Sequence, residues 1–132
     1  MNLQISGIFQ ITSWDETTDI QHPDGAKQTS ASITQMYSGD LEGVSQPKYI
    51  MCYTADGMAV FCGYENVEVS VNGKSGSFVL QHDGRFENSV ASSRFMIVPN
   101  SGQGELVNIE GHGTFTSGEK GQAHYQLEIT QL

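Results

Sequence analysis

Cysteine, tryptophan, proline and positive charge are all scarce in this chain of 132 residues. The two cysteines, Cys52 and Cys62, are too few for a disulfide framework and lack the spacing of metal ligands. The four histidines are isolated from one another and form no zinc signature. We therefore interpret both thiols as reduced packing residues, with a cross-strand bridge or a reactive pair as the alternatives, and we expect no metal and no cofactor.

Lys and Arg number 6 against 15 Asp and Glu, which gives a net charge of -9. Such a surface repels phosphate backbones and anionic lipid, so nucleic acid and membranes are poor candidate partners. No apolar run approaches the roughly 18 residues that a membrane-spanning helix requires, and residues 1–6 have neither a basic start nor an apolar signal region. We expect a cytoplasmic protein.

A sustained helical pattern is also missing, since no stretch keeps an apolar period of about 3.6 residues. Glycine is abundant instead, with 15 residues, and turn signals separate runs that alternate between apolar and polar side chains. We predict one all-β domain, residues 1–132. Residues 15–27 are predicted as a surface loop that could act as a lid, and residues 105–109 as a helical turn. In chain order, the first four predicted strands are 3–14, 28–37, 44–54 and 58–71. The fifth starts at Lys74 and ends within 83–89, the sixth contains Phe95 and Ile97, and the last two are 110–116 and 124–132.

Asn72 and Gly73 give the strongest hairpin signal in the sequence. An Asn-Gly pair between two alternating runs favours a two-residue type I′ turn, because both central residues of that turn need a positive φ. The turn makes Val71 face Lys74 and fixes every pairing outward from there. The strand period of two then places these side chains on the core face: Val67, Val69, Val71, Phe78 and Leu80.

Two titratable side chains fall on the same core face of this hairpin. Glu65 faces Leu80 and His82 faces Gly63, so the carboxylate and the imidazole are diagonal neighbours, roughly 7 to 8 Å apart at Cα and within reach of each other. Such a pair in a desolvated interior can transfer protons, which makes Glu65 and His82 our candidate catalytic residues. The structural alternative is a buried ion pair or hydrogen bond that fills the interior.

The connection through Ala55, Asp56 and Gly57 leaves two registers open between the third and fourth strands. A two-residue loop buries an ammonium group, whereas a three-residue loop with Gly57 in the left-handed conformation buries tyrosines. Burying an ammonium is expensive and burying a phenol is not, so we favour the three-residue loop. It places Tyr49, Met51 and Tyr53 in the core instead of Lys48, Ile50 and Cys52.

Eight sequential strands with one apolar face each would leave long, adhesive edges in an open sheet. Closure removes the edges, and a barrel of about eight strands either holds one small ligand or is filled by side chains. We predict an eight-stranded antiparallel up-and-down barrel, with a two-sheet sandwich as the alternative. Apolar residues at outward positions predict a homo-oligomer, most simply a dimer. They are Ile50, Cys52, Cys62, Val79 and Met96.

Four motifs follow one another along the chain: SGDLEG at 38–43, GYE at 63–65, GKSGSFVLQH at 73–82 and VPNSGQGEL at 98–106. In this order they resemble a bacterial family known only as domain of unknown function 3224, and the similarity runs from Phe9 to about Phe115. The resemblance implies the barrel of the allene oxide cyclases and no activity. Gly102-Gln103-Gly104 is also similar to the Gly-Thr-Gly segment of those cyclases and of plant dirigent proteins, which implies a ligand inside the barrel mouth.

Three functions are compatible with these patterns. The first is a barrel that binds a small hydrophobic or amphipathic molecule inside its mouth. The second is a cofactor-independent isomerase or cyclase that uses Glu65 and His82 as an acid/base pair, and the third is a plugged barrel that acts as an oligomeric structural protein. We rank the binding barrel first. Its predicted ligand-binding residues are Glu42, Tyr49, Tyr53, Glu65, Phe78, Leu80, His82 and Tyr125.

Overall fold

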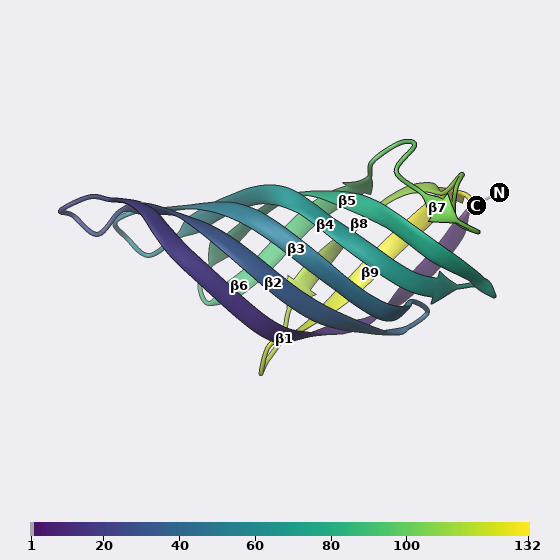
Figure 1. Ribbon diagram of the computed structural model, residues 1–132. Helices are drawn as coiled ribbons and strands as arrows, with labels where there is room; N and C mark the ends of the chain where they lie inside the picture. The colour runs from purple at the N-terminus through teal and green to yellow at the C-terminus, as the bar shows by residue number, and fades with distance from the viewer. Residues whose placement is uncertain (1) are drawn as a thin grey trace.

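The computed structural model describes residues 2–132, and they form a closed antiparallel barrel of eight strands with one short extra strand, β7 (Figure 1). Around the ring the strand order is β1-β2-β3-β4-β5-β6-β8-β9, and the pairing of β9 with β1 closes it, whereas β7 pairs with β5 alone. The predicted fold class is confirmed. The strands are β1 (Leu3–Gln21), β2 (Lys27–Gly39), β3 (Glu42–Tyr53), β4 (Ala59–Val71), β5 (Lys74–Glu87), β6 (Val90–Ile97), β7 (Gln103–Gly104), β8 (Glu110–Ser117) and β9 (Gln122–Gln131).

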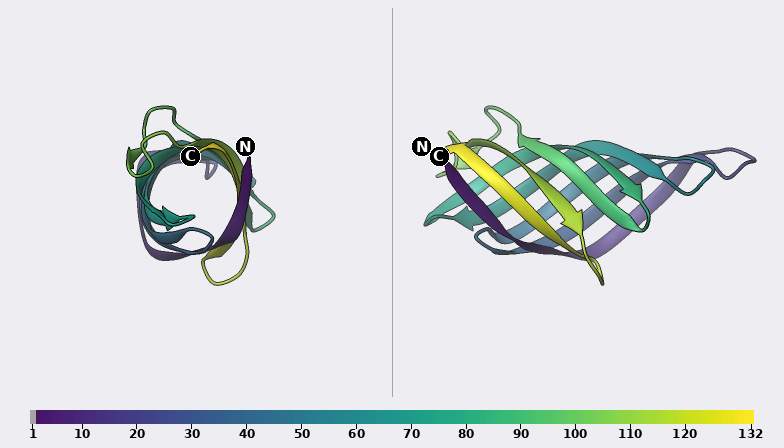
Figure 2. Two further views of the ribbon diagram at one scale, coloured as in Figure 1. Left: turned by 90° about the vertical axis from the view of Figure 1, so that its right-hand side faces the viewer. Right: turned by 180° about the vertical axis from the view of Figure 1, so that it is seen from behind.

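Seen along its axis the barrel is a single ring, and seen from the side its strands are strongly inclined (Figure 2). Both ends of the chain lie at the same end of the barrel as β7 and the turn between β4 and β5 (Figures 1 and 2). Among the described residues there is no helix with the length and apolar character that a membrane crossing requires.

The register of the central hairpin is the predicted one. Val71 pairs with Lys74, Val67 with Phe78 and Glu65 with Leu80. Asn72 and Gly73 have φ angles of 52° and 78°, as a type I′ turn requires. Every residue predicted for the core face of this hairpin is buried, because the period of two holds along both strands.

The three-residue loop between β3 and β4 is also confirmed. Tyr49 pairs with Gly63, the Thr54 amide donates to the Met58 carbonyl, and Gly57 has a φ of 87°. Tyr49 and Met51 are therefore buried and Tyr53 is half-buried. The exposed side chains of Lys48, Ile50 and Cys52 lie on the outer face.

The prediction of a surface loop or lid at residues 15–27 is wrong. Strand β1 continues to Gln21 and pairs with β2 as far as Lys27, so only residues 22–26 form a turn. A β-bulge between Ile11 and Ser13 interrupts the alternation, and the hairpin then extends beyond the barrel, where no apolar core marks one of its faces (Figure 1). The polar composition of residues 15–27 is therefore typical of a loop, although most of their backbone is paired as a hairpin.

One end of the barrel is closed by buried side chains. Leu41 from the turn between β2 and β3 is 2% exposed, and Leu106 and Ile109 from the segment between β7 and β8 are 0% and 1% exposed. Residues 105–108 form turns, as expected, with the Ile109 amide donating to the Leu106 carbonyl. The Tyr125 hydroxyl accepts a hydrogen bond from the Leu41 amide (2.9 Å), which ties this plug to β9.

Candidate functional site

The opposite end of the barrel holds a cavity of about 280 Å³. The turn between β5 and β6 and the turn between β8 and β9 border it through Ser89, Gly118 and Gly121. Its wall is mostly aromatic and aliphatic because residues of all eight barrel strands converge there, and no charged residue lines it. The large apolar side chains of the lining are Phe9, Ile11, Trp14, Ile33, Met51, Phe61, Phe86 and Phe115.

Two polar side chains reach the cavity from β2 and β3. Gln35 is 3% exposed and Tyr49 is 6% exposed, and both line the cavity. The Gln35 amide donates to Glu65 and to Ser45, so its orientation is fixed. The Tyr49 hydroxyl forms no hydrogen bond with another group in residues 2–132. Every fully buried side-chain oxygen or nitrogen in these residues does have a hydrogen-bond partner, so the Tyr49 hydroxyl is not fully buried and is accessible from the cavity. A ligand would find a hydrogen-bonding group at this point of a mostly apolar wall.

Glu65 and His82 meet inside the barrel, as the register predicted. The distance from His82 Nε2 to Glu65 Oε1 is 2.7 Å, and the two side chains are each 1% exposed. The other carboxylate oxygen, Oε2, accepts hydrogen bonds from the Tyr37 hydroxyl (2.5 Å) and the Gln35 amide (3.1 Å). On the far side of the ring, His82 Nδ1 is 2.8 Å from the Ser93 hydroxyl. The pair therefore has a complete set of partners within the protein.

Ser93 orients the ring of His82. Its hydroxyl donates a hydrogen bond to the Arg94 carbonyl (3.1 Å) and lies 2.8 Å from His82 Nδ1. The other ring nitrogen, Nε2, is thereby directed at Glu65 Oε1, while Glu65 Oε2 holds the Tyr37 hydroxyl and the Gln35 amide.

Aromatic rings seal this polar group from the cavity. Tyr49, Phe95 and Phe115 each lie with their ring centroids 5.1 to 5.6 Å from the His82 ring. Burial, followed by the charge of Glu65, raises the pKa of Tyr37 and of Tyr49 well above the usual value of 10.0. Both phenols are therefore neutral hydrogen-bonding groups over the ordinary pH range.

The predicted ligand-binding residues do not form one group. Tyr49 lines the cavity, and Tyr53 is half-buried at the end of β3, near the cavity-lining Met51. Glu65 and His82 lie beneath the cavity, whereas Phe78, Leu80 and Tyr125 are core residues outside its lining. Glu42 is exposed at the start of β3, opposite Ser70, and takes no part in the interior.

Sequence reasoning missed most of the cavity wall. Phe9, Phe61 and Phe115 belong to separate strands, and only barrel closure brings them together, with Phe9 and Phe115 at a centroid distance of 5.2 Å. Ser93 was missed as well, although it lies two residues before Phe95 in β6 and so faces the interior as Phe95 does. That alternation was the available signal, because it places position 93 on the face of His82.

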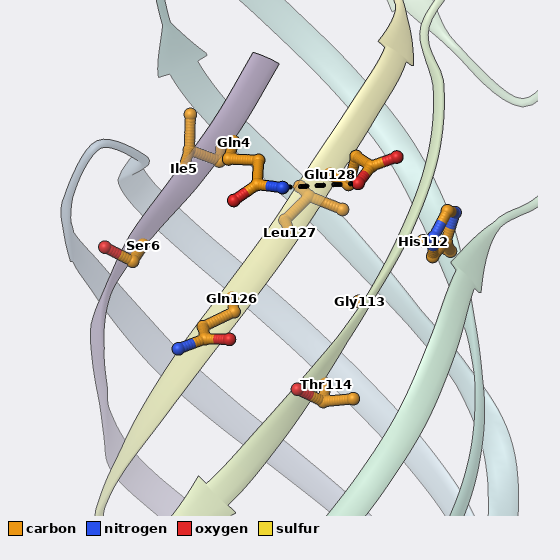
Figure 3. A pocket seen from close by; sticks show the side chains of 9 residues that line it. All are labelled: Gln4, Ile5, Ser6, His112, Gly113, Thr114, Gln126, Leu127 and Glu128. Atoms are coloured by element: carbon orange, nitrogen blue, oxygen red, sulfur yellow. Dashed lines mark hydrogen bonds between the residues drawn. The ribbon is translucent and has the colours of Figure 1, made fainter. Parts of the chain in front are cut away.

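A larger hollow of about 390 Å³ lies on the outer wall across β1, β9 and β8 (Figure 3). Polar side chains surround it, among them the exposed Gln4 and Thr114 and the half-buried Glu128, to which Gln4 donates a hydrogen bond (3.4 Å). It is a shallow groove on a curved sheet rather than an enclosed space, and the titratable residues of the interior do not reach it. The mouth cavity is therefore the better candidate site. Across residues 2–132, no three His, Cys, Asp or Glu side chains group as metal ligands.

The fold and the cavity define a small closed β-barrel, plugged at one end and hollow at the other. The chain belongs to the family described as "Protein of unknown function (DUF3224)", whose model matches residues 5–129. The crystal structure of a DUF3224 protein of unknown function from Shewanella oneidensis MR-1 is similar, with 27% identity and a TM-score of 0.78 over 100% of this chain and 98% of that one. No curated protein matches the chain. The family resemblance seen in the sequence is confirmed, and it assigns no function.

Proposed function

We propose that the protein binds a small, largely apolar molecule in the cavity at the open end of the barrel. The observation that carries this proposal is an aromatic-lined hollow of about 280 Å³ in a barrel whose other end is filled with side chains. A dry apolar cavity of about 150 Å³ is large enough to hold benzene. The space here therefore suits a molecule of one or two rings, or a short aliphatic chain.

The buried Glu65 and His82 pair gives less support to an isomerase or cyclase. Each side chain is 1% exposed, and every polar atom of the pair has a partner within the protein. A general acid or base has to come within hydrogen-bond reach of the substrate proton. Access to either group from the cavity would require Gln35, Tyr49 or Phe115 to move aside.

Titration with Prodan, a neutral probe with one two-ring naphthalene system whose fluorescence changes in apolar surroundings, tests the proposal. We expect saturable binding of one probe per chain in the native protein. The Ala91→Phe substitution, at a half-buried cavity-lining position on β6, fills the space and should weaken binding by about tenfold or more, equivalent to about 1.4 kcal/mol.

Thr116→Phe is the matched control, because Thr116 is exposed on the outer face of β8 and the substitution adds the same ring. It should leave the probe affinity unchanged. Non-saturable binding in the native protein, or equal affinity in both variants, would refute the proposal.

A further inference from the structure

The bulge in β1 turns a carboxylate toward the mouth of the barrel. Ile11 pairs with Gln35 and Ser13 with Thr34, so one extra residue in β1 switches the inward parity from odd to even numbers. Trp14, opposite Ile33, then lines the cavity, and Glu16 lies one step further along the same face. Glu16 does not itself line the cavity, but its carboxylate is 2.9 Å from the indole nitrogen of Trp14, which does, so the charge lies directly behind this part of the wall.

This carboxylate is held by three neutral donors. Glu16 Oε2 accepts hydrogen bonds from the hydroxyls of Thr29 (2.6 Å) and Tyr53 (2.7 Å), and Oε1 accepts one from the indole Nε1–H of Trp14 (2.9 Å). Thr29 is fully buried, which fixes one of these donors in place. Burial alone raises the pKa of Glu16, but the three hydrogen bonds and the charge of Lys27 together lower it, so the group is ionised at neutral pH.

No cation is in contact with this anion among residues 2–132. The two ion pairs within 4.0 Å there involve His82 with Glu65 and Arg85 with Glu87. The Lys27 ammonium instead lies over the Tyr53 ring, 4.9 Å from its centroid. Oε1 of Glu16, which receives only the Trp14 donor, therefore retains the capacity to accept another hydrogen bond.

We propose that the ligand of the mouth cavity is an apolar amine, with its ring or chain in the aromatic pocket and its ammonium group on Glu16. This inference rests on the proposed function. A carboxylate ligand would meet Glu16 and find no cationic residue in the lining. The net charge of -9 adds to the discrimination, because the field of an acidic surface attracts cations and repels anions.

A set of three probes with one ring system and different head groups tests the inference: naphthylethylamine, naphthylethanol and naphthylacetate. Calorimetric titration should rank the amine first, the alcohol second and the carboxylate last. We expect the amine to bind about fivefold or more tightly than the alcohol, as a partly exposed ion pair provides. The Glu16→Gln substitution should abolish this difference and leave the affinity for the alcohol unchanged.

Asp15→Asn is the matched control, because Asp15 is exposed on the opposite face of β1 and the substitution removes the same charge. It should keep the preference for the amine. Unchanged binding of naphthylethanol shows that the Glu16→Gln variant is folded. If the alcohol binds and the amine is not preferred, or if Glu16→Gln retains the preference, the inference is wrong while the proposed function stands. If none of the three probes binds, the proposed function itself fails.

Discussion

Glu65 is a buried carboxylate whose environment is built entirely from protein groups. Its two oxygens contact three side chains from two other strands: Tyr37 and Gln35 of β2 and His82 of β5. The network adds only modestly to the free energy of unfolding. Removing one partner costs much more, because the buried polar groups that remain cannot form hydrogen bonds with water instead. The network thus specifies which side chains occupy the middle of the barrel.

Replacement of Glu65 by Leu tests this role. The substitution leaves the imidazole of His82 and the Tyr37 hydroxyl buried without their acceptor, so we expect the free energy of unfolding to fall by about 3–5 kcal/mol. Urea-induced unfolding followed by circular dichroism measures the loss. Glu68→Leu is the control, since Glu68 is exposed on the outer face of the same strand, and its effect should stay within about 0.5 kcal/mol. Equal effects of the two substitutions would contradict the prediction.

At the scale of the element, two hairpin turns share a backbone but differ in sequence. Asn72 and Gly73 have φ angles of 52° and 78°, and Asn88 and Ser89 have φ angles of 54° and 64°. The left-handed conformation costs an L-residue roughly 1–2 kcal/mol relative to glycine. The turn between β5 and β6 therefore carries strain at Ser89 that the turn between β4 and β5 avoids.

Exchange of the second turn residue should have opposite effects in the two hairpins. Gly73→Ser is expected to destabilise the protein by about 1 kcal/mol, and Ser89→Gly to stabilise it by a similar amount. An added Cβ at position 73 meets no atom within 4 Å, so the loss reflects the backbone alone. Denaturant midpoints of both single variants and of the double variant provide the measurement. The turns lie at opposite ends of the barrel, so the double variant should be close to the native protein.

At the scale of the whole molecule, the outer wall of β3 and β4 carries an apolar patch formed by Ile50, Cys52, Val60, Cys62 and Tyr64. Ile50 pairs with Cys62, and Cys52 with Val60, so the side chains are contiguous. Ile50 is 62% exposed and Tyr64 57% exposed. Both thiols are free and exposed, which corrects the prediction that they are packing residues: their outward parity places them on the surface. Contiguous exposed apolar surface is typical of an interface.

We expect this patch to join two copies of the chain. Sedimentation velocity at micromolar concentration should show a dimer in the native protein and a monomer in the Ile50→Lys variant, because an ammonium group in the contact would have to be desolvated. Thr114→Lys adds the same charge on the exposed face of β8 and should remain dimeric. A native protein that sediments as a monomer would exclude an interface here.

Local chemistry explains which parts of the fold could be predicted. Asn72-Gly73 and Gly57 specify their turns through the sign of φ, and each turn then fixes the parity of two long strands. For this reason the pairing of Glu65 with His82 could be predicted from the sequence alone. Residues 15–27 could not be predicted, because a polar hairpin beyond the core has no apolar face from which a period of two can be recognised.

The sequence by itself determined the register of the central hairpins, and with it the set of side chains that face inward. Only the tertiary structure decided which inward positions are filled and which remain open. Leu41, Leu106 and Ile109 come from irregular segments that close one end, and Phe9, Phe61 and Phe115 surround a cavity at the other. The physical reason is that alternation is a property of neighbours along a strand, whereas a cavity depends on volumes contributed by strands distant in sequence.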